Sequence, residues 1–218
     1  MQSIILIAPP AAGKGTQSKL ICDKYQIPHI STGDLLRSSC KEQSDMGELI
    51  RKTMESGNLV TDEIVLKLLE SRINKSDCDN GFVLDGFPRN ISQAKSYLEI
   101  LNKQNKPLGI VLYLDVPEEI TRKRITGRRS CPSCGAVFNV ELDNSLNGLC
   151  NKCGIELIKR ADDTDEIFNE RYKTYENETY PLVDFFKEKG LLTTIEYKET
   201  IEETFADIDK IINRGNIW

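Results

Sequence analysis

The chain has 218 residues, enough for a large buried core in one or two domains. Its 39% hydrophobic and 29% charged residues are typical of a soluble globular protein, and its net charge of −5 argues against a general binder of nucleic acid or of membrane surfaces. The apolar run Ile4–Ala8 is too short to cross a bilayer and lacks the charged leader of a secretory signal. We therefore expect a cytoplasmic protein.

Short apolar strands alternate with helical patterns along most of the chain. The predicted strands are Ile4–Ile7, Phe82–Asp85, Ile110–Asp115 and Leu192–Glu196. The predicted helices are Gln17–Lys24, Asp62–Asn74, Ile91–Lys103, Glu118–Thr126 and Thr164–Lys189. This alternation predicts right-handed crossover units and a parallel sheet that helices cover on both faces.

Two segments interrupt this alternation, and both are predicted to be insertions on an α/β core. Ser31–Val60 contains two helix-like pieces and no convincing strand. Gly127–Thr164 is rich in Cys, Gly, Asn and Asp, with a β-like piece at Ala136–Val140.

The segment APPAAGKGT lies between the first strand and the first helix, where a phosphate-binding loop is found. Glycines at 13 and 15 let backbone N–H groups approach phosphate oxygens, Lys14 supplies positive charge, and Thr16 offers a hydroxyl near a magnesium ion. The segment differs from G-x-x-x-x-G-K-[ST], because Ala8 replaces the first glycine and Gly15 follows the lysine. Taken alone, it is also compatible with a surface turn that carries a solvated lysine.

Four of the seven cysteines form the pattern C-x2-C-x15-C-x2-C, which has the spacing of a tetrahedral zinc site. Four thiolates close the coordination sphere, so the predicted role is structural; the ligands alone do not separate zinc from iron. The alternative is a set of unpaired cytosolic cysteines. The predicted metal ligands are Cys131, Cys134, Cys150 and Cys153, and the ordinary reduced cysteines are Cys22, Cys40 and Cys78.

Six motifs in a fixed order make the chain resemble the adenylate kinase family, in the form whose long lid carries a metal-binding cysteine cluster. They are GKGTQ, IPHISTGDLLR, SGNLVTDE, GFVLDGFPRNISQA, RITGRRSCPSC and KRADDTDE. The resemblance extends from Ile4 to about Phe205 and implies a monomer with a three-layer α/β core of the P-loop NTPase type around a parallel five-stranded sheet. The implied divisions are a core of residues 1–30, 61–126 and 165–218, a helical monophosphate-binding insertion of residues 31–60, and a small zinc-ribbon-like lid of residues 127–164.

The resemblance implies the reaction ATP + AMP ⇌ 2 ADP with magnesium. Arginine suits this chemistry because its planar fork pairs with phosphate and stays charged. By the resemblance, Arg128 contacts the ATP side, and the arginines converge on the transferred group. The implied catalytic residues are Lys14, Arg89, Arg124, Arg128, Arg160 and Arg171.

The resemblance also implies two nucleotide sites. The expected ATP-binding residues are Ala11, Ala12, Gly13, Lys14, Gly15, Thr16, Arg124, Arg128, Val137, Phe138 and Glu199. The expected AMP-binding residues are Thr32, Arg37, Asn58, Leu59, Val60, Gly86, Phe87, Pro88, Arg89, Gln93, Arg160 and Arg171. Thr32 and Gln93 are the expected readers of the acceptor adenine.

Acidic residues are expected to serve the magnesium ion and the lid. Asp85, with Asp34 nearby, is expected to hold magnesium through water, although a capping role for either is an alternative. Asp162 and Asp163 match an acidic pair at the lid hinge. His29 is expected to be a packed polar residue without a catalytic role.

The chain differs from the family at two places. The family usually carries glycine at the positions of Ala8 and Ala11, and an alanine there is costly if its φ must be positive. The family also usually has a sequence close to Asp-Gly-Thr where this chain has Glu196–Thr200, so selectivity for the ATP base is in question.

Three rival functions follow from the same residues. A sister enzyme would phosphorylate UMP or CMP, but Gln93 and the long lid favour AMP. A non-catalytic nucleotide sensor is disfavoured by the full set of arginines. A zinc-ribbon nucleic-acid binder is disfavoured by the acidic balance.

Overall fold

The computed structural model describes residues 3–40, 44–55, 60–140, 147–159 and 163–214. Its centre is a sheet of five parallel strands in the order β2-β3-β1-β4-β7. The strands are β1 (Ser3–Ile7), β2 (His29–Ser31), β3 (Phe82–Asp85), β4 (Leu108–Asp115) and β7 (Leu192–Glu196). The predicted parallel sheet is confirmed. The edge strand β2 was not among the four predicted strands, because three residues give too short a pattern.

Helices connect these strands in crossover units. They are α1 (Lys14–Tyr25), α2 (Thr32–Ser39), α3 (Asp45–Glu55), α4 (Asp62–Ile73), α5 (Ile91–Lys103), α6 (Glu118–Thr126), α7 (Asp165–Thr174), α8 (Pro181–Glu188) and α9 (Ile201–Arg214). A 3-10 turn, η1 (Ser76–Cys78), precedes β3.

Two helical predictions need correction. The single helix expected over Thr164–Lys189 is divided, since a π-helical turn η2 (Tyr175–Thr179) separates α7 from α8. The last helix, α9, was not predicted, although buried Ile208 and Ile212 and the packed Phe205 have the spacing of one helical face.

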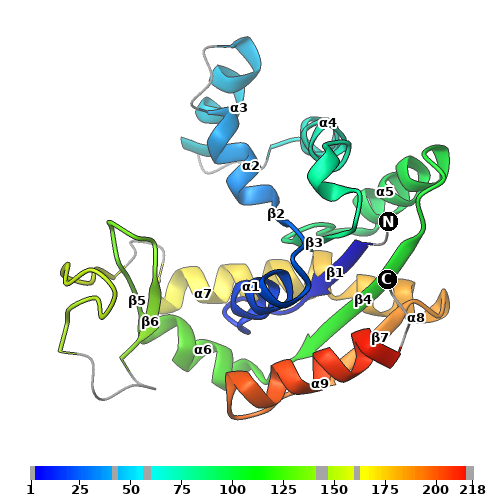
Figure 1. The fold of residues 1–218 in the computed structure, drawn as a ribbon. Coiled ribbons are helices and arrows are strands. Elements are labelled where there is room, and N and C mark those ends of the chain that lie inside the picture. Colours follow the sequence, from blue (N-terminus) through cyan, green and yellow to red (C-terminus); the bar gives the residue numbers. More distant parts are fainter. Residues whose placement is uncertain (1–2, 41–43, 56–59, 141–146, 160–162, 215–218) are drawn as a thin grey trace.

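The sheet has a hydrophobic core on each face, as a buried parallel sheet requires. On β1, Ile5 and Ile7 pack into one core with residues of α4, α5 and α8. Ile4 and Leu6 alternate with them and pack into the other core, with residues of α1 and α9. Figure 1 shows the central β1 between these helical layers.

Two parts of the chain project from this layered core. α2 and α3 extend beyond β2, and the hairpin β5 (Arg128–Ser130) and β6 (Val137–Asn139) lies beyond α6 and α7 (Figure 1). Within the residues that the structure describes, no helix combines the length and the apolar character that a membrane span requires.

Candidate active site

The predicted phosphate loop leaves the central strand β1 and enters α1, which begins at Lys14. The cap residue Gly13 offers no side-chain hydrogen bond, and the first turn of α1 contains no acidic residue. By contrast, the first turns of α2 and α7 carry Asp34 and Asp165. The first N–H groups of α1 and its positive dipole end are therefore left for an external anion.

The two alanines that replace family glycines are in different environments. Ala8 is buried, and its methyl group belongs to the core shared with α1 and α9. Ala11 has φ 60°, in the left-handed region that disfavours any residue with a Cβ. Of the two possibilities that the sequence left open for Ala11, the structure shows the costly one.

Lys14, Asp85 and His29 form one charged group beside the loop. Lys14 Nζ lies 3.5 Å from Asp85 Oδ1, and His29 Nε2 lies 3.1 Å from Asp85 Oδ2. Burial opposes ionisation of Asp85, yet the hydrogen bond from His29 and the charge of Lys14 hold the pKa of this carboxyl below its usual value. The prediction for His29 as a packed residue is wrong, because its side chain is 33% exposed and contacts Asp85 at the end of β3.

Arg89 and Arg171 bring further positive charge to the same place. Lys14 keeps 26% of its side chain exposed, but surrounding protein desolvates it and, with Arg89 nearby, lowers its pKa. Arg89 is exposed as a residue, yet desolvation of its guanidinium and the charge of Arg171 lower the pKa of Arg89. Among the predicted catalytic cations, Arg89 is therefore close enough to repel both Lys14 and Arg171.

The turn after β3 orients Arg89. Its Nε donates to the Gly86 carbonyl at 3.0 Å, and Thr32 Oγ1 donates to the same carbonyl at 3.0 Å. Phe87 and Pro88 are buried, so neither side chain is open to a ligand in this structure. Val60, another expected AMP-binding residue, packs against the core on this face of the sheet.

The Gln93 side chain, the predicted base reader, is buried and bonded at both ends within the protein. Its Oε1 accepts from the Arg89 N–H at 2.7 Å, and its Nε2 donates to Asp62 Oδ1 at 2.6 Å. In this structure Gln93 therefore connects the Arg89 turn to the start of α4.

Arg124 reaches the phosphate loop from the last turn of α6, where its Nη1 donates to the Ala12 carbonyl at 3.0 Å. Arg128 forms a two-point pair with the buried Asp163, in which its Nε lies 2.8 Å from Asp163 Oδ2. Arg37 Nη2 is 2.5 Å from Asp34 Oδ1, and both side chains are exposed on α2. The structure thus brings Arg124 to the loop, and it pairs Arg128 and Arg37 with carboxylates.

The other expected ATP-binding side chains lie on three different parts of the chain. Val137 is exposed on β6, whereas Phe138 packs against Cys131, Cys150 and Leu157 of the hairpin region. Thr16 and Glu199 are exposed, the first on α1 and the second between β7 and α9. Four predicted site residues, Asn58, Leu59, Arg160 and Asp162, lie outside the described residues.

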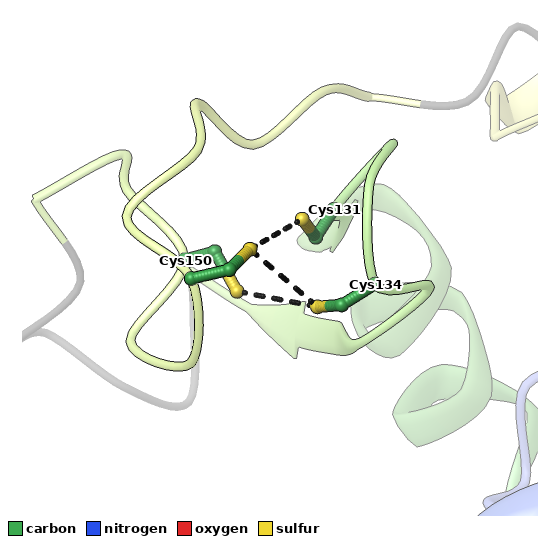
Figure 2. A group of neighbouring side chains, drawn as sticks. Cys131, Cys134 and Cys150 are labelled. Carbon is green, nitrogen blue, oxygen red and sulfur yellow. Dashed lines mark hydrogen bonds between the residues drawn. The ribbon is translucent and has the colours of Figure 1, made fainter.

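The four lid cysteines converge in space. Figure 2 shows Cys131, Cys134 and Cys150 pointing toward one another. All four Sγ atoms lie within 4.8 Å of one another, and three pairs are 3.4, 3.6 and 3.7 Å apart. A tetrahedral zinc ion with Zn–S bonds of about 2.3 Å separates its sulfurs by roughly 3.8 Å, so this donor set fits zinc.

Both cysteine pairs have the same local fold. In each, the N–H of the glycine after the second cysteine donates to the carbonyl of the first, from Gly135 to Cys131 and from Gly154 to Cys150. Both glycines have positive φ, which explains why glycine follows each C-x-x-C. Backbone N–H groups, first that of Cys134, lower the pKa of Cys131 to about 6 and favour the thiolate that a metal binds.

The chain matches known proteins over almost its full length. The family model described as adenylate kinase matches residues 6–191. An adenylate kinase of Clostridium botulinum (strain Loch Maree / Type A3) is 44% identical over 212 residues, which cover 97% of this chain and 98% of the relative. An adenylate kinase of Clostridium perfringens (strain SM101 / Type A) is 42% identical over 96% of this chain and 97% of the relative.

This chain belongs to the adenylate kinase family.

It is therefore a nucleoside monophosphate kinase, and the family predicted from the six motifs is confirmed. The uncapped start of α1 and the cations around Lys14 suit the phosphate groups of the nucleotides that such a kinase uses. The four cysteines form a cluster that is compatible with a metal ion.

Proposed function

We propose that this chain transfers the terminal phosphoryl group of Mg-ATP to AMP, giving two ADP, and that Lys14, Arg89 and Arg171 form the centre of the transfer site. The observation that carries the residue roles is the crowding of these cations beside the uncapped N-terminus of α1. Without a ligand, the pKa values of Lys14 and Arg89 are lowered by burial and by neighbouring positive charge. A polyphosphate relieves that repulsion, so the site is built for an anion.

Positioning and charge stabilisation carry such a reaction, because the transferred group needs little covalent help from the protein. Ala11–Thr16 contribute backbone N–H groups that hold the ATP phosphates, and Arg124 contacts the loop at the Ala12 carbonyl. Arg89 holds the acceptor phosphate, and Arg171 neutralises charge as it develops. The remaining arginines of this set are Arg128, Arg160 and Arg37.

Acceptor binding uses the surface between β3 and α2. Thr32 and the Gly86–Arg89 backbone line it, and Gln93 reads the base after exchanging one of its internal partners, Asp62 or the Arg89 N–H. Asn58, Leu59 and Val60 complete this side.

Asp85 is suited to hold magnesium through water, since its ionised carboxylate lies beside the loop at the end of β3. Asp34 and the Thr16 hydroxyl are the further oxygen donors that we assign to it. The bound ion would neutralise phosphate oxygens during transfer.

The domain division proposed from the resemblance gives two moving parts. Residues 31–60 carry the acceptor, and residues 127–164 form a zinc-stapled lid that covers ATP through Val137, Phe138 and the backbone near Glu199. Closure excludes water, which would otherwise take the phosphoryl group. Arg128 leaves Asp163 for the ATP phosphates in the closed state. We further propose a monomeric, cytoplasmic enzyme.

A coupled assay for ADP formation from ATP and AMP tests the proposal. Lys14→Met should lower kcat/KM by about 10²–10³-fold, because it removes a charge from the transfer site. Lys19→Met is the matched control, since Lys19 is exposed on the same helix, and it should leave turnover unchanged. Full activity of Lys14→Met, or a preference for UMP or CMP over AMP in a monophosphate panel, would contradict the proposal.

A further inference from the structure

Tyr197 follows β7 in the segment Glu196–Thr200, where this chain differs from the family pattern. Its ring faces Arg124, whose guanidinium carbon lies 5.6 Å from the ring centroid. This distance is within the range of a cation–π contact. A residue far along the chain thus contacts one of the arginines expected at the ATP site.

Arg124 is held between this ring and the phosphate loop. Its Nη1 donates to the Ala12 carbonyl, and the same nitrogen would lie 3.6 Å from a Cβ added to Gly13. The backbone carbonyl of Arg124 accepts a hydrogen bond from Asn139 Nδ2 of β6 at 2.9 Å. Arg124 is therefore the point where the loop, the lid hairpin and the β7–α9 connection meet.

The segment that carries Tyr197 is itself anchored. Gln17 Nε2 of α1 donates to the Ile201 carbonyl at 3.0 Å, and Glu203 Oε2 accepts from the Thr200 hydroxyl at 2.8 Å. Tyr197 is half-buried. A ring on a fixed segment limits the rotamers of the arginine that packs on it. Less conformational entropy then remains to be lost when that arginine binds a ligand.

We propose that Tyr197 is a positioning residue that holds Arg124 against the phosphate loop and thereby raises the affinity for the donor nucleotide. The inference rests on the proposed function of the loop as the ATP site. Tyr197 acts through Arg124 and serves the donor and not the acceptor, because its contact lies at Ala12–Gly13 and not at the Gly86–Arg89 turn.

Calorimetric titration with the non-hydrolysable donor Mg-AMP-PNP, and separately with AMP, tests this role. Tyr197→Ala should weaken AMP-PNP binding about fivefold, which corresponds to about 1 kcal/mol for a cation–π contact. Its affinity for AMP should be unchanged. Tyr197→Phe keeps the ring and should bind AMP-PNP like the unmodified chain, whereas Tyr197→Leu keeps bulk without the ring and should resemble Tyr197→Ala.

A double-mutant cycle identifies the route of the effect. In an Arg124→Met background, Tyr197→Ala should cause no further loss of AMP-PNP affinity, because the partner of the ring is already gone. The control is Tyr25→Ala at the opposite end of α1, where Lys24 lies 5.8 Å from the Tyr25 ring centroid. This variant should lower the melting temperature without changing AMP-PNP affinity.

The inference is overturned if Tyr197→Ala binds AMP-PNP normally, if both nucleotides lose affinity equally, or if the loss persists in full in the Arg124→Met background. Absence of ADP formation by the unmodified chain would refute the proposed function instead. The calorimetric affinities for Tyr197 variants do not depend on turnover, so the two outcomes can be told apart.

Discussion

Ala11 shows how a single methyl group imposes a cost on the phosphate loop. An L-residue in the left-handed region has a conformational free energy roughly 1–2 kcal/mol less favourable than that of glycine. Ala11 lies in this region, with φ 60°. Glycine, however, gives the unfolded chain more freedom, which offsets about 0.4–1 kcal/mol.

Ala11→Gly should therefore raise the free energy of unfolding by about 0.5–1 kcal/mol, the difference between these two effects. Ala8→Gly is the matched control in the same loop and should have the opposite sign. Ala8 is buried in the core, so losing its methyl should cost about 1–2 kcal/mol. Urea unfolding measures the free energy of unfolding of both variants. Destabilisation by Ala11→Gly would show that Ala11 does not strain the loop.

At this scale the sequence predicted residue types better than partners. GKGT after a strand was enough to place Lys14 in a loop ahead of a helix, although the helix begins at Lys14 itself and not at the predicted Gln17. His29 and Asp85 are 56 positions apart, and their contact depends on the pairing of β2 with β3. Strand order is a property of the whole sheet, so no local pattern predicts such a contact. The bond of Gln93 to Asp62 likewise depends on how α4 and α5 pack, although its bond to the Arg89 N–H is only four residues away.

The lid illustrates an element that is too small to support itself. Its described hydrophobic cluster contains only Cys131, Cys150 and Leu157 as buried members, with Ala136 and Phe138 against them. So small a cluster supplies little of the free energy that ordering a chain requires. Metal binding supplies the difference if the four thiolates hold zinc.

Removal of the metal with a chelator should increase hydrogen exchange of amides in residues 131–158 and lower the melting temperature. Amides of β1 and β4 should stay protected, because their strands lie in the centre of the sheet. Cys134→Ser should reproduce the effect, and the chelator should then add nothing. Metal analysis should first verify that the metal has been removed. If hydrogen exchange in the lid is then unchanged, the structural role of the metal is contradicted.

The spacing of the cysteines was sufficient to predict that they converge, since each C-x-x-C folds locally. The division of α7 from α8 was not predicted. A π-helical turn changes the hydrogen-bond pattern without changing the apolar spacing much, so Thr164–Lys189 has the sequence pattern of one helix.

For the whole molecule, the strands are not arranged in the sheet in their chain order. Helical connections on both faces of the sheet allow strands that are distant in sequence to pair. β1 pairs with β3 and β4, which follow it by about 80 and 105 residues. Alternating helices and strands predicted this parallel arrangement in general form. The alternation did not predict α9, whose buried face packs with α1 in the core on one face of the sheet.

Ile208→Ala should reduce the free energy of unfolding by about 2–4 kcal/mol, because Ile208 is fully buried between α9 and the sheet. Ile201→Ala on the same helix removes a side chain that is 48% exposed and should change it by no more than about 0.5 kcal/mol. Denaturant unfolding of the two variants measures the difference. Equal effects would mean that α9 does not contribute to the core.

The packing of α9 on α1 has a consequence for synthesis of the chain. Asp209 accepts a hydrogen bond from Tyr25 and pairs with Lys24, and the Ile201 carbonyl accepts one from Gln17. The helix behind the phosphate loop is therefore held by residues that lie 184 or more positions later in the sequence. A nascent polypeptide still attached to the ribosome, with α9 inside the exit tunnel, has its loop-bearing helix exposed on one side. The loop-bearing helix is therefore expected to be packed on both sides only after α9 has left the tunnel.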